Sequence, residues 1–339
     1  MILIDCVYLN SEGGKKILSI FLDKLGHTNN KKYFFLFDNR INKKILELQN
    51  ANTCQLIHAS ERNRIAFYIE NKSKIKKAIC LANVPPPIRL KSSVFIYFHN
   101  DLLLSPFKSG SLLFALTFFL KKIYIILKSS NNYNWIVQTE LMKTKLSNSL
   151  WVNKKRILVL PIFADNIMTR NIIKVKKSFL YVCSTAKHKN LKRLIEGFNS
   201  INNIKDFNLN LHLTIGDKKY FNDNIYVKNI NPRLKIINHG TLSSAKLESL
   251  YSESEFLIFP SLIESFGLPL IESVGFNCKV IAADLPYVDE VITPSIKFNP
   301  YSSKSIANAI DKAILSQNIP YSKLIIKNKI DKFINLINK

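Results

Sequence analysis

Short apolar runs alternate with stretches of helical period along almost the whole chain. A short apolar run bounded by polar residues is typical of a buried strand, and apolar positions three or four residues apart are typical of a helix packed on one side. Alternating strands and helices favour βαβ units, because parallel strands need a crossover connection. The pattern therefore predicts an α/β protein built on parallel sheets.

The pattern stops once and then starts again, which predicts two domains. Strands are expected at 2–8, 33–37, 54–58, 78–81, 94–98, 135–138 and 157–160, and again at 179–183, 209–215, 225–227, 235–237, 256–259 and 280–283. Helices are expected between them, at 15–25, 62–72, 191–199, 245–251, 268–275 and 305–315. A polar, basic stretch separates the two series. We predict two Rossmann-like domains, over 1–165 and 178–339, facing each other across a cleft, with a linker over 166–177 and the option that the terminal helix packs back on the first domain.

The composition indicates a folded chain with an anionic partner. Hydrophobic residues make up 47% and charged residues 22% of the 339 residues, as in ordinary globular proteins. Lys and Arg number 49 against 24 Asp and Glu, which gives a net charge of +25. Such an excess points to a phosphorylated ligand, a nucleic acid or an anionic membrane. A compositional bias toward Lys, Asn and Ile, with only 9 Gly, is an alternative source of part of this charge.

The cysteines and the N-terminal residues indicate a cytoplasmic protein. The five cysteines are scattered without a CxxC pair or a His at ligand spacing, so buried, reduced thiols are expected at Cys6, Cys54, Cys80, Cys183 and Cys278. The first ten residues carry no basic region followed by a long apolar run, and they resemble a first strand rather than a signal peptide.

The longest apolar stretch, 111–127, is interrupted by Lys121 and Lys122. A membrane-spanning helix needs about 20 apolar residues, so a span is not predicted. A buried helix is the first interpretation. An interfacial helix is the second, because a basic pair among aromatic residues suits the headgroup region of a membrane.

The stretch 256–273 carries the most chemical information. A buried strand ends at Pro260, a loop holds Glu264, and Gly267 and Pro269 mark the start of a helix. Backbone N–H groups and the helix dipole at such a start favour a phosphate. Glu272 lies about one turn into the helix, so two carboxylates flank the phosphate position and can accept hydrogen bonds from sugar hydroxyls. Surface glutamates that merely favour a helix N-terminus are the alternative.

This stretch, FPSLIESFGLPLIES, resembles the EX7E signature of retaining, family-4-type glycosyltransferases of the GT-B fold. Three further segments, in family order, resemble the same proteins: the strand and phosphate loop from Phe179 to Asn190, the strand and glycine at 213–217, and the strand, glycine and helix at 239–251. The similarity runs from 179 to 314. It implies a GT-B fold and a glycosyltransferase of the group 1 type, similar to enzymes of bacterial surface-polysaccharide synthesis.

The resemblance also implies site residues. Glu264 would hold the donor sugar, and Lys189 would neutralise the leaving phosphate. Glu272 would bind the donor ribose, and the backbone of Phe266, Gly267 and Leu268 would meet the diphosphate. Asn190, Gly216 and Ser265 complete the expected donor site of this half. Many family members carry Arg where Ser184 stands, and Arg193 or Lys187 is the candidate to compensate.

The first half is similar to the family at fewer points. Gly13 and Gly14 resemble a glycine loop that closes over the donor, with a simple tight turn as the alternative. His99 follows a predicted strand, where the family often has a histidine near the reacting centre; a structural hydrogen bond is its alternative role. Residues 135–139 end another strand and are a weaker candidate for contact with acceptor or donor.

Several motifs are absent from the sequence. There is no Asp-x-Asp pair, no P-loop, no GxSxG and no metal-ligand cluster, so no metal or other cofactor is expected. The implied reaction is transfer from a nucleoside diphosphate sugar to a glycan, with a lipid-linked acceptor and a peripheral place on the inner face of the membrane. A basic nucleic-acid-binding protein and a weakly active sugar-nucleotide-binding relic are the two alternatives, and no nucleic acid is expected as partner.

Overall fold

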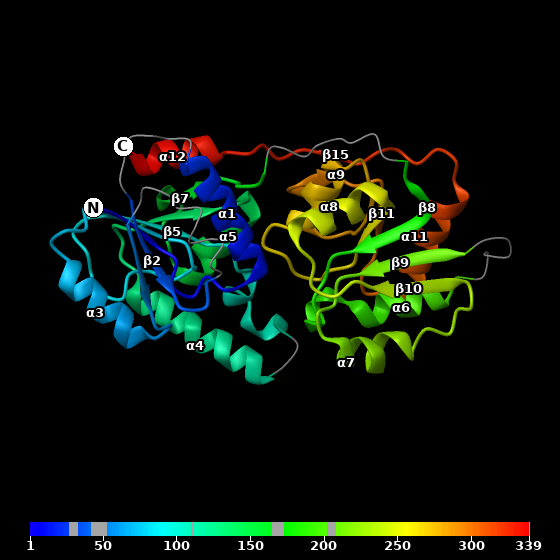
Figure 1. Ribbon diagram of the computed structural model, residues 1–339, viewed down its shortest axis with the longest axis horizontal. Coiled ribbons are helices and arrows are strands. Elements are labelled where there is room, and N and C mark those ends of the chain that lie inside the picture. The colour runs from blue at the N-terminus through cyan, green and yellow to red at the C-terminus, as the bar shows by residue number, and fades with distance from the viewer. Residues whose placement is uncertain (27–32, 42–52, 110–111, 165–172, 202–207, 339) are drawn as a thin grey trace. The chain divides into compact units, whose positions relative to one another are not determined.

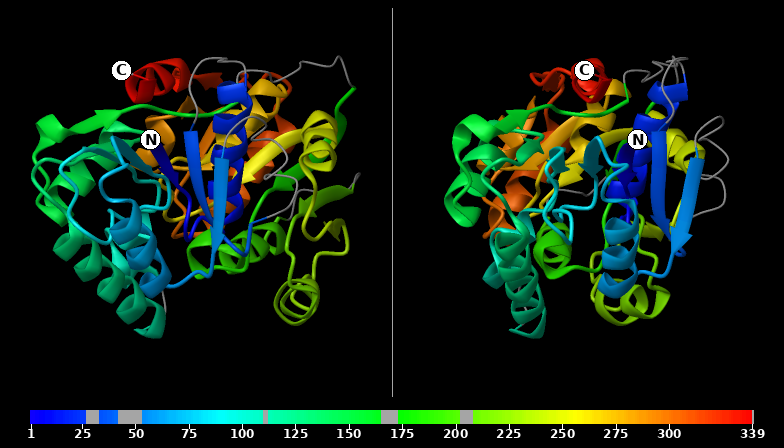
Figure 2. Two further views of the ribbon diagram at one scale, coloured as in Figure 1. Left: turned by 60° about the vertical axis from the view of Figure 1, so that its left-hand side comes forward. Right: turned by 90° about the vertical axis from the view of Figure 1, so that its left-hand side faces the viewer.

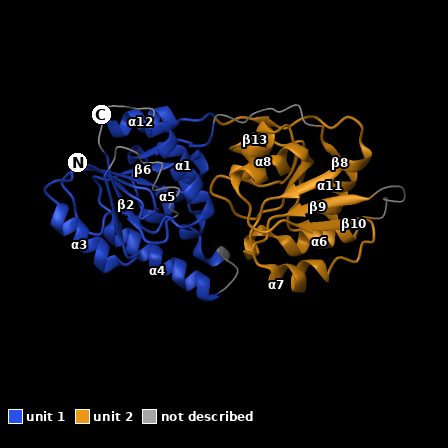
Figure 3. Cartoon of the chain, viewed as in Figure 1, with its two compact units in different colours: residues 1–107, 111–165, 327–339 blue, residues 108–110, 166–326 orange. Residues whose placement is uncertain are grey.

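The computed structural model describes residues 1–26, 33–41, 53–109, 112–164, 173–201 and 208–338, which form two compact units (Figures 1 and 3). Unit 1 comprises 1–107, 111–165 and 327–339, and unit 2 comprises 108–110 and 166–326. Strand β8 begins at Val175, inside the segment predicted as a linker. The C-terminal residues belong to unit 1 rather than to the domain that precedes them in sequence.

Unit 1 is built on a parallel sheet in the order β3-β2-β1-β4-β5-β6-β7. Its strands are β1 (Ile2–Asp5), β2 (Tyr33–Asp38), β3 (Thr53–Ile57), β4 (Lys77–Cys80), β5 (Ser93–Tyr97), β6 (Asn134–Val137) and β7 (Ile157–Val159). Its helices are α1 (Glu12–Gly26), α3 (Glu61–Asn71), α4 (Leu112–Lys128), α5 (Glu140–Leu150) and α12 (Ile330–Asn338), with short 3-10 turns η1 (Asp101–Leu103), η2 (Pro106–Ser109) and η3 (Lys154–Arg156). The order in which successive strands join the sheet reverses between the parallel strands β1 and β4, the arrangement in which ligands bind beyond the strand ends.

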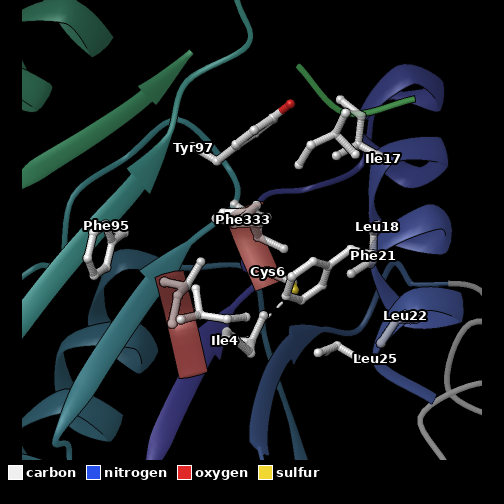
Figure 4. Packing of buried hydrophobic residues seen from close by; sticks show 14 of the residues in the cluster. Ile4, Cys6, Ile17, Leu18, Phe21, Leu22, Leu25, Phe95, Tyr97 and Phe333 are labelled. Atoms are coloured by element: carbon white, nitrogen blue, oxygen red, sulfur yellow. Dashed lines mark hydrogen bonds between the residues drawn. The ribbon is translucent and has the colours of Figure 1, made fainter. Parts of the chain in front are cut away.

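Two apolar layers cover the two faces of this sheet. One layer joins alternate residues of the central strands to α1 and α12, and Figure 4 shows Phe21 and Phe333 meeting above Ile4. Their rings are 5.3 Å apart. The other layer joins the opposite face to α3, α4 and α5. Because both faces are covered, the strands are apolar at nearly every position, as expected of a parallel sheet.

Unit 2 repeats the plan, with the parallel order β10-β9-β8-β11-β12-β14. The strands are β8 (Val175–Tyr181), β9 (Leu209–Leu213), β10 (Leu234–Asn238), β11 (Ser254–Phe259), β12 (Lys279–Ala283) and β14 (Ile296–Phe298), beside an antiparallel pair, β13 (Ile292–Thr293) and β15 (Lys323–Leu324). The helices are α6 (Leu191–Asn199), α7 (Lys218–Phe221), α8 (Ser244–Glu253), α9 (Leu268–Gly275), α10 (Pro286–Asp289) and α11 (Ser303–Leu315), with the 3-10 turn η4 (Lys187–Lys189) and the π-helical turn η5 (Asn222–Tyr226). Both units are Rossmann-like.

Polar residues placed just before the helices fix where these helices begin. Ser60, Thr139, Ser243 and Ser302 each accept a hydrogen bond from a backbone N–H in the first turn of α3, α5, α8 and α11, respectively. Such caps satisfy N–H groups that have no partner inside the helix. Each cap lies a few residues after the end of a strand. The alternation of strands and helices predicted from the sequence is therefore found in the structure.

One predicted strand is wrong. Residues 225–227 were expected to form a strand, but η5 occupies this segment and Tyr226 and Val227 are exposed. Strand β9 pairs with β8 on one side and with β10 on the other, so residues 225–227 cannot pair beside β9. The short apolar run indicated a strand only because periodicity does not distinguish short segments.

Helix α4 is not the buried helix that was the first interpretation of 111–127. Only Ala115 and Ile125 are buried, and most of its large apolar side chains are exposed. The helix is apolar on nearly all sides, whereas packing on the sheet covers only one stripe. Within the described residues, no helix has the length and apolar character required to cross a membrane.

The sheet of unit 1 is fixed to α3 by a buried ion pair. Asp5, at the end of β1, is 1% exposed and lies 2.8 Å from the guanidinium of Arg64, which is 0% exposed. The Tyr68 hydroxyl donates to the same Asp5 oxygen at 2.6 Å, and the Val7 N–H donates to the other at 3.0 Å. A buried charge needs such compensation.

We expect Asp5→Asn to lower the free energy of unfolding by about 3–5 kcal/mol, because it leaves the Arg64 charge buried and unpaired. Urea titration measures this loss. Asp5→Leu with Arg64→Leu removes both charges and should recover most of it. Lys15→Ala, at the exposed pair with Glu12, is the control and should cost at most about 1 kcal/mol. Equal losses at the two pairs would contradict the assignment.

Candidate functional site

The order of strands in unit 2 brings two loops together. The order in which successive strands join the sheet reverses between the parallel neighbours β8 and β11, so the loops that follow them lie side by side at the carboxyl edge of the sheet. The N–H of Leu262 donates to the carbonyl of His188 at 2.8 Å, which ties one loop to the other. Residues 182–190 and 260–267 therefore form one surface at this edge.

Lys189 and Glu264 meet on this surface. The ammonium nitrogen of Lys189 lies 2.5 Å from a carboxylate oxygen of Glu264, although the two residues are 75 positions apart in sequence. Their side chains are 18% and 15% exposed, so the pair is shielded but remains accessible from solvent. A charge-assisted hydrogen bond of this kind holds both side chains in a defined place.

Asn190 lies beneath this pair and joins three segments. Its backbone is left-handed, with φ of 59°, and the residue is only 4% exposed. The side-chain amide donates to the carbonyls of Pro260 at 3.2 Å and Pro300 at 2.7 Å, and its oxygen accepts from Arg193 at 3.1 Å. The amide thus serves the loop framework, and a contact of Asn190 with a donor stays a prediction.

Three residues that the sequence did not single out support the same loops. The hydroxyl of Tyr181, at the end of β8, donates to the carbonyl of Lys189 at 2.7 Å and lies 2.9 Å from the hydroxyl of Ser261. Tyr287 donates to the carbonyl of Ser261 at 2.7 Å. Burial raises the pKa of both tyrosines well above its usual value, so both are donors at neutral pH. The sequence feature that could have indicated Tyr181 is its polar hydroxyl at the end of an otherwise apolar run.

Helix α9 begins beside Glu264. Gly267, at its N-terminal boundary, has φ of 77°, a conformation that disfavours any side chain. Leu268 and Pro269 open the helix, and the Phe266 side chain is buried. The backbone of 266–268 therefore lies at the positive end of the helix dipole, where an anion is stabilised. Ser265 in the preceding loop is half-buried.

Glu272 lies one turn further along α9 and is half-buried. Burial of the Tyr251 phenol raises its pKa well above the usual value, and the negative charge of Glu272 raises this pKa further. The Glu272 carboxylate is therefore close to a buried hydroxyl that remains protonated. This places Glu272 and Glu264 on the same helix start, as their spacing predicts.

Gly216 lies in the loop that follows β9 and is exposed. A Cβ there would lie 2.7 Å from the Thr241 hydroxyl, so the loop after β9 and the loop after β10 approach each other closely at this glycine. Ser184 and Lys187 are exposed, and Arg193 is the basic side chain that contacts Asn190.

In unit 1 the predicted glycine loop is part of a helix. Gly13 and Gly14 lie in the first turn of α1, where the hydroxyl of Ser11 accepts from the N–H of Gly14 at 3.2 Å. A Cβ on Gly13 would meet open space, whereas one on Gly14 would lie 2.8 Å from Leu9. The correction has a simple cause, because Ser11 caps the helix two residues earlier than the glycines suggested.

His99 follows β5 and is held by Asn83, which follows β4. The side-chain oxygen of Asn83 accepts from the backbone N–H of His99 at 2.6 Å, and its amide nitrogen lies 3.4 Å from His99 Nε2. Asn83 has φ of 68° and is 8% exposed. Burial lowers the pKa of His99 to about 4, so the ring is neutral at pH 7. Nothing in the sequence pattern singled out Asn83.

The weaker candidate at 135–139 does not offer the expected contacts. Trp135 is 0% exposed and its ring packs on Phe98, while Thr139 is 3% exposed and caps α5. These side chains serve the core and the helix start. Buried thiols are found at four cysteines, but Cys54 is exposed on β3, contrary to the prediction. No cluster of three or more possible metal ligands occurs among the described residues.

Comparison with known proteins agrees with this geometry. Residues 165–331 match the family described as "Glycosyl transferases group 1". The match spans unit 2, which is therefore similar to a group 1 glycosyltransferase domain. Over 134 residues the chain is 31% identical to the O-antigen chain mannosyltransferase RfbU of Salmonella typhimurium strain LT2, a match that covers 39% of this chain and 37% of RfbU. The matched part is thus little more than a third of that relative.

Solved structures show that the fold extends over the whole chain. WaaG, a glycosyltransferase involved in lipopolysaccharide biosynthesis, superposes with a TM-score of 0.66 at 12% identity over 93% of this chain and 91% of its own. HepE of Anabaena, in complex with UDP and glucose, gives 0.66 at 13% identity over 93% and 90%. The chain therefore has the GT-B fold, with two Rossmann-like units, and the unit that the family model matches is the one that holds Lys189 and Glu264.

We expect Asn190→Ala in unit 2 to lower the free energy of unfolding by about 2–4 kcal/mol. The substitution removes two buried hydrogen bonds, at about 1 kcal/mol each, and places Ala in a left-handed conformation. Asn190→Gly keeps the backbone and should cost less. The control is Asn199→Ala, whose exposed amide donates to the carbonyl of Lys228. The urea midpoints of the three variants test this prediction. Equal midpoints for Asn190→Ala and Asn199→Ala would contradict the role of Asn190 in joining the loops.

His99 predicts a pH dependence of stability. Its pKa is about 4 in the folded chain against an ordinary 6.5, so between these values the unfolded chain binds a proton that the folded chain does not. Stability contributed by His99 is present above pH 6.5 and is lost as the pH falls toward 4. His99→Gln should therefore weaken the fall in urea midpoint between pH 7 and pH 5. His212, whose pKa is also lowered to about 4 by burial, is present in both proteins and cancels in the comparison.

Proposed function

We propose that this chain is a retaining glycosyltransferase that moves a hexosyl group from a nucleoside diphosphate sugar to a glycan. The acceptor is lipid-linked, and the product belongs to bacterial surface polysaccharide such as O-antigen or capsule. The observation that carries the proposal is the ion pair of Lys189 and Glu264 beside the start of α9. It unites a cation, a sugar-hydroxyl acceptor and a phosphate-binding helix start in one place.

The three groups have separate tasks in this proposal. The N–H groups at 266–268 and the Lys189 ammonium stabilise the negative charge that develops on the leaving diphosphate. Glu264 accepts hydrogen bonds from sugar hydroxyls and orients the ring. Glu272 binds the donor ribose. This electrostatic arrangement needs no metal ion to neutralise the leaving group, and we propose a metal-independent reaction.

The proposed step breaks the bond between the anomeric carbon and the diphosphate oxygen. The acceptor hydroxyl oxygen forms its bond to the same face of the anomeric carbon, so the configuration is retained. The departing phosphate oxygen takes the acceptor proton. No side chain of the chain is required as a nucleophile, and the products are the free nucleoside diphosphate and the extended glycan.

The nature of donor and acceptor is supported by the compared proteins and by charge. RfbU is named as an O-antigen chain mannosyltransferase, and WaaG as an enzyme of lipopolysaccharide biosynthesis. HepE holds UDP and glucose. These names favour a hexose donor and a surface-glycan acceptor. The net charge of +25 suits an acceptor that carries phosphate at a membrane surface, with the protein on the cytoplasmic side.

A thermal-shift panel of UDP, GDP, ADP, CMP and dTDP, each with and without its sugar, tests donor binding. A ligand at 100 times its Kd stabilises by about 2.7 kcal/mol, which raises Tm by a few degrees. Lys189→Ala should weaken the responding nucleotide about 10- to 100-fold, because it removes a charge-assisted contact to phosphate. Lys192→Ala, at the exposed pair with Glu196 in the adjacent helix, is the matched control and should bind as the original chain does.

Release of nucleoside diphosphate on addition of acceptor tests turnover. We expect Glu264→Gln to bind the nucleotide alone nearly as well as the original chain does but to lose most turnover with the sugar donor. Release that EDTA leaves unchanged supports metal independence. Binding without release, with every acceptor fraction from a surface-glycan extract, would instead identify a sugar-nucleotide-binding protein. Lack of a response to all five nucleotides would remove the main support for the proposal.

A further inference from the structure

One face of α4 is a continuous apolar surface that the chain leaves uncovered. Helical residues follow one another at about 100°, so positions 112, 113, 116, 119, 120, 123 and 127 share an arc of about 120°. All seven are Leu, Phe or Ile and are exposed, and we call them the α4 outer face: Leu112 83%, Leu113 80%, Leu116 54%, Phe119 39%, Leu120 58%, Ile123 38% and Leu127 76%. Figures 1 and 2 show α4 as the long teal helix at the lower border of unit 1.

The opposite side of α4 is anchored to unit 1. Ile125 is fully buried in the core beneath the sheet, and Ala115 is 3% exposed. The hydroxyl of Tyr124 donates to Glu61 at the start of α3. The α4 outer face is therefore presented by a helix fixed on its other side, and it does not arise from a helix detached from the fold.

A neighbouring aromatic residue extends this face. Phe107, in η2, is 75% exposed, and its ring lies 6.3 Å from that of Phe119. Single exposed apolar side chains are common on soluble proteins, but a contiguous group of this size marks an interaction surface.

The charges around the α4 outer face indicate which partner covers it. No Asp or Glu occurs between Asp101 and Glu140, whereas Lys108, Lys121, Lys122 and Lys128 lie in this segment. On the helix, all three lysines of α4 fall outside the apolar arc, at about 120–140° from its centre, with Lys121 on one side and Lys122 on the other. An uncharged apolar face, on a helix whose charged side chains are all lysines, is complementary to acyl chains, and the long lysine side chains can extend toward anionic headgroups.

We propose that the α4 outer face docks the protein on an anionic lipid bilayer, with α4 parallel to the membrane plane. The apolar residues enter the boundary between headgroups and acyl chains, and the lysines remain at the level of the headgroup phosphates. The inference goes further than the membrane location in the proposed function, because it assigns the contact surface and its chemistry. It stands on the α4 residues alone and requires neither donor nor acceptor.

Co-sedimentation with vesicles of phosphatidylcholine, with and without phosphatidylglycerol, tests this docking. The full chain should bind the vesicles that contain phosphatidylglycerol and bind less as salt is raised. Leu113→Gln with Leu120→Gln should weaken binding about tenfold or more, since two large apolar side chains no longer leave water. Lys121→Gln with Lys122→Gln should weaken binding roughly fivefold per lysine on the anionic vesicles and much less on the neutral ones.

The matched control is Ile230→Gln with Leu315→Gln, which removes two apolar side chains of similar exposure, 78% and 55%, from unit 2. This control should bind vesicles as the original chain does. The substituted apolar side chains and Lys121 are exposed and Lys122 is half-buried at the helix surface, so Tm should change little, and a Tm scan excludes unfolding. As a second measurement, Phe119→Trp should be quenched by brominated acyl chains, whereas a tryptophan that replaces Tyr226 in η5 should not.

Three outcomes would overturn the proposal. The first is equal binding to vesicles with and without phosphatidylglycerol at low salt. The second is retention of binding by Leu113→Gln with Leu120→Gln. The third is a dimer in sedimentation that this double variant abolishes while no vesicle binding occurs, which would make a second copy of the chain the partner. Nucleotide binding is measured without lipid, so failure of the docking and failure of the proposed reaction are distinguishable.

Discussion

The candidate site depends on the parallel pairing of β8 with β11. These strands are neighbours in the sheet but are separated in sequence by three crossover connections, so their carboxyl ends bring distant loops to one edge. Lys189 and Glu264 meet because of this pairing, and the bond from Leu262 to His188 fixes the distance between the loops. A different strand order would leave both residues intact and the site absent.

The pairing alone is not sufficient, because loops at a sheet edge expose backbone groups that need partners. Asn190, Tyr181 and Tyr287 supply them, with side chains that are buried and fully engaged in holding Pro260, Pro300, Ser261 and Lys189. Buried polar groups without partners are costly, so these contacts favour one loop arrangement over its alternatives. The precision of the ion pair thus rests on residues that do not take part in it.

Unit 1 uses the same strand order with different chemistry. Asn83 follows β4 and His99 follows β5, on one side of the point where the strand order reverses. Gly13 and Gly14 lie in the first turn of α1, the helix that follows β1. The charged group beneath this edge, Asp5 with Arg64, is fully buried and serves the fold. The segment between Asp101 and Glu140 contains four lysines and no acidic residue, and it accounts for part of the net positive charge of the chain.

The sequence by itself determined the α/β class, most strands, most helix starts and the position of Glu264 just before, and Glu272 just inside, one helix start, because these follow from periodicity, caps and short spacing. Only the tertiary structure decided that Asn190 joins loops, that Asn83 holds His99, that residues 225–227 do not pair, and that the terminal helix belongs to unit 1. It also decided that α4 is exposed, although its sequence suits a buried helix equally well. The physical reason is the same throughout: local pattern fixes which face of an element is apolar, whereas contacts between segments far apart in sequence fix what that face or a polar side chain meets.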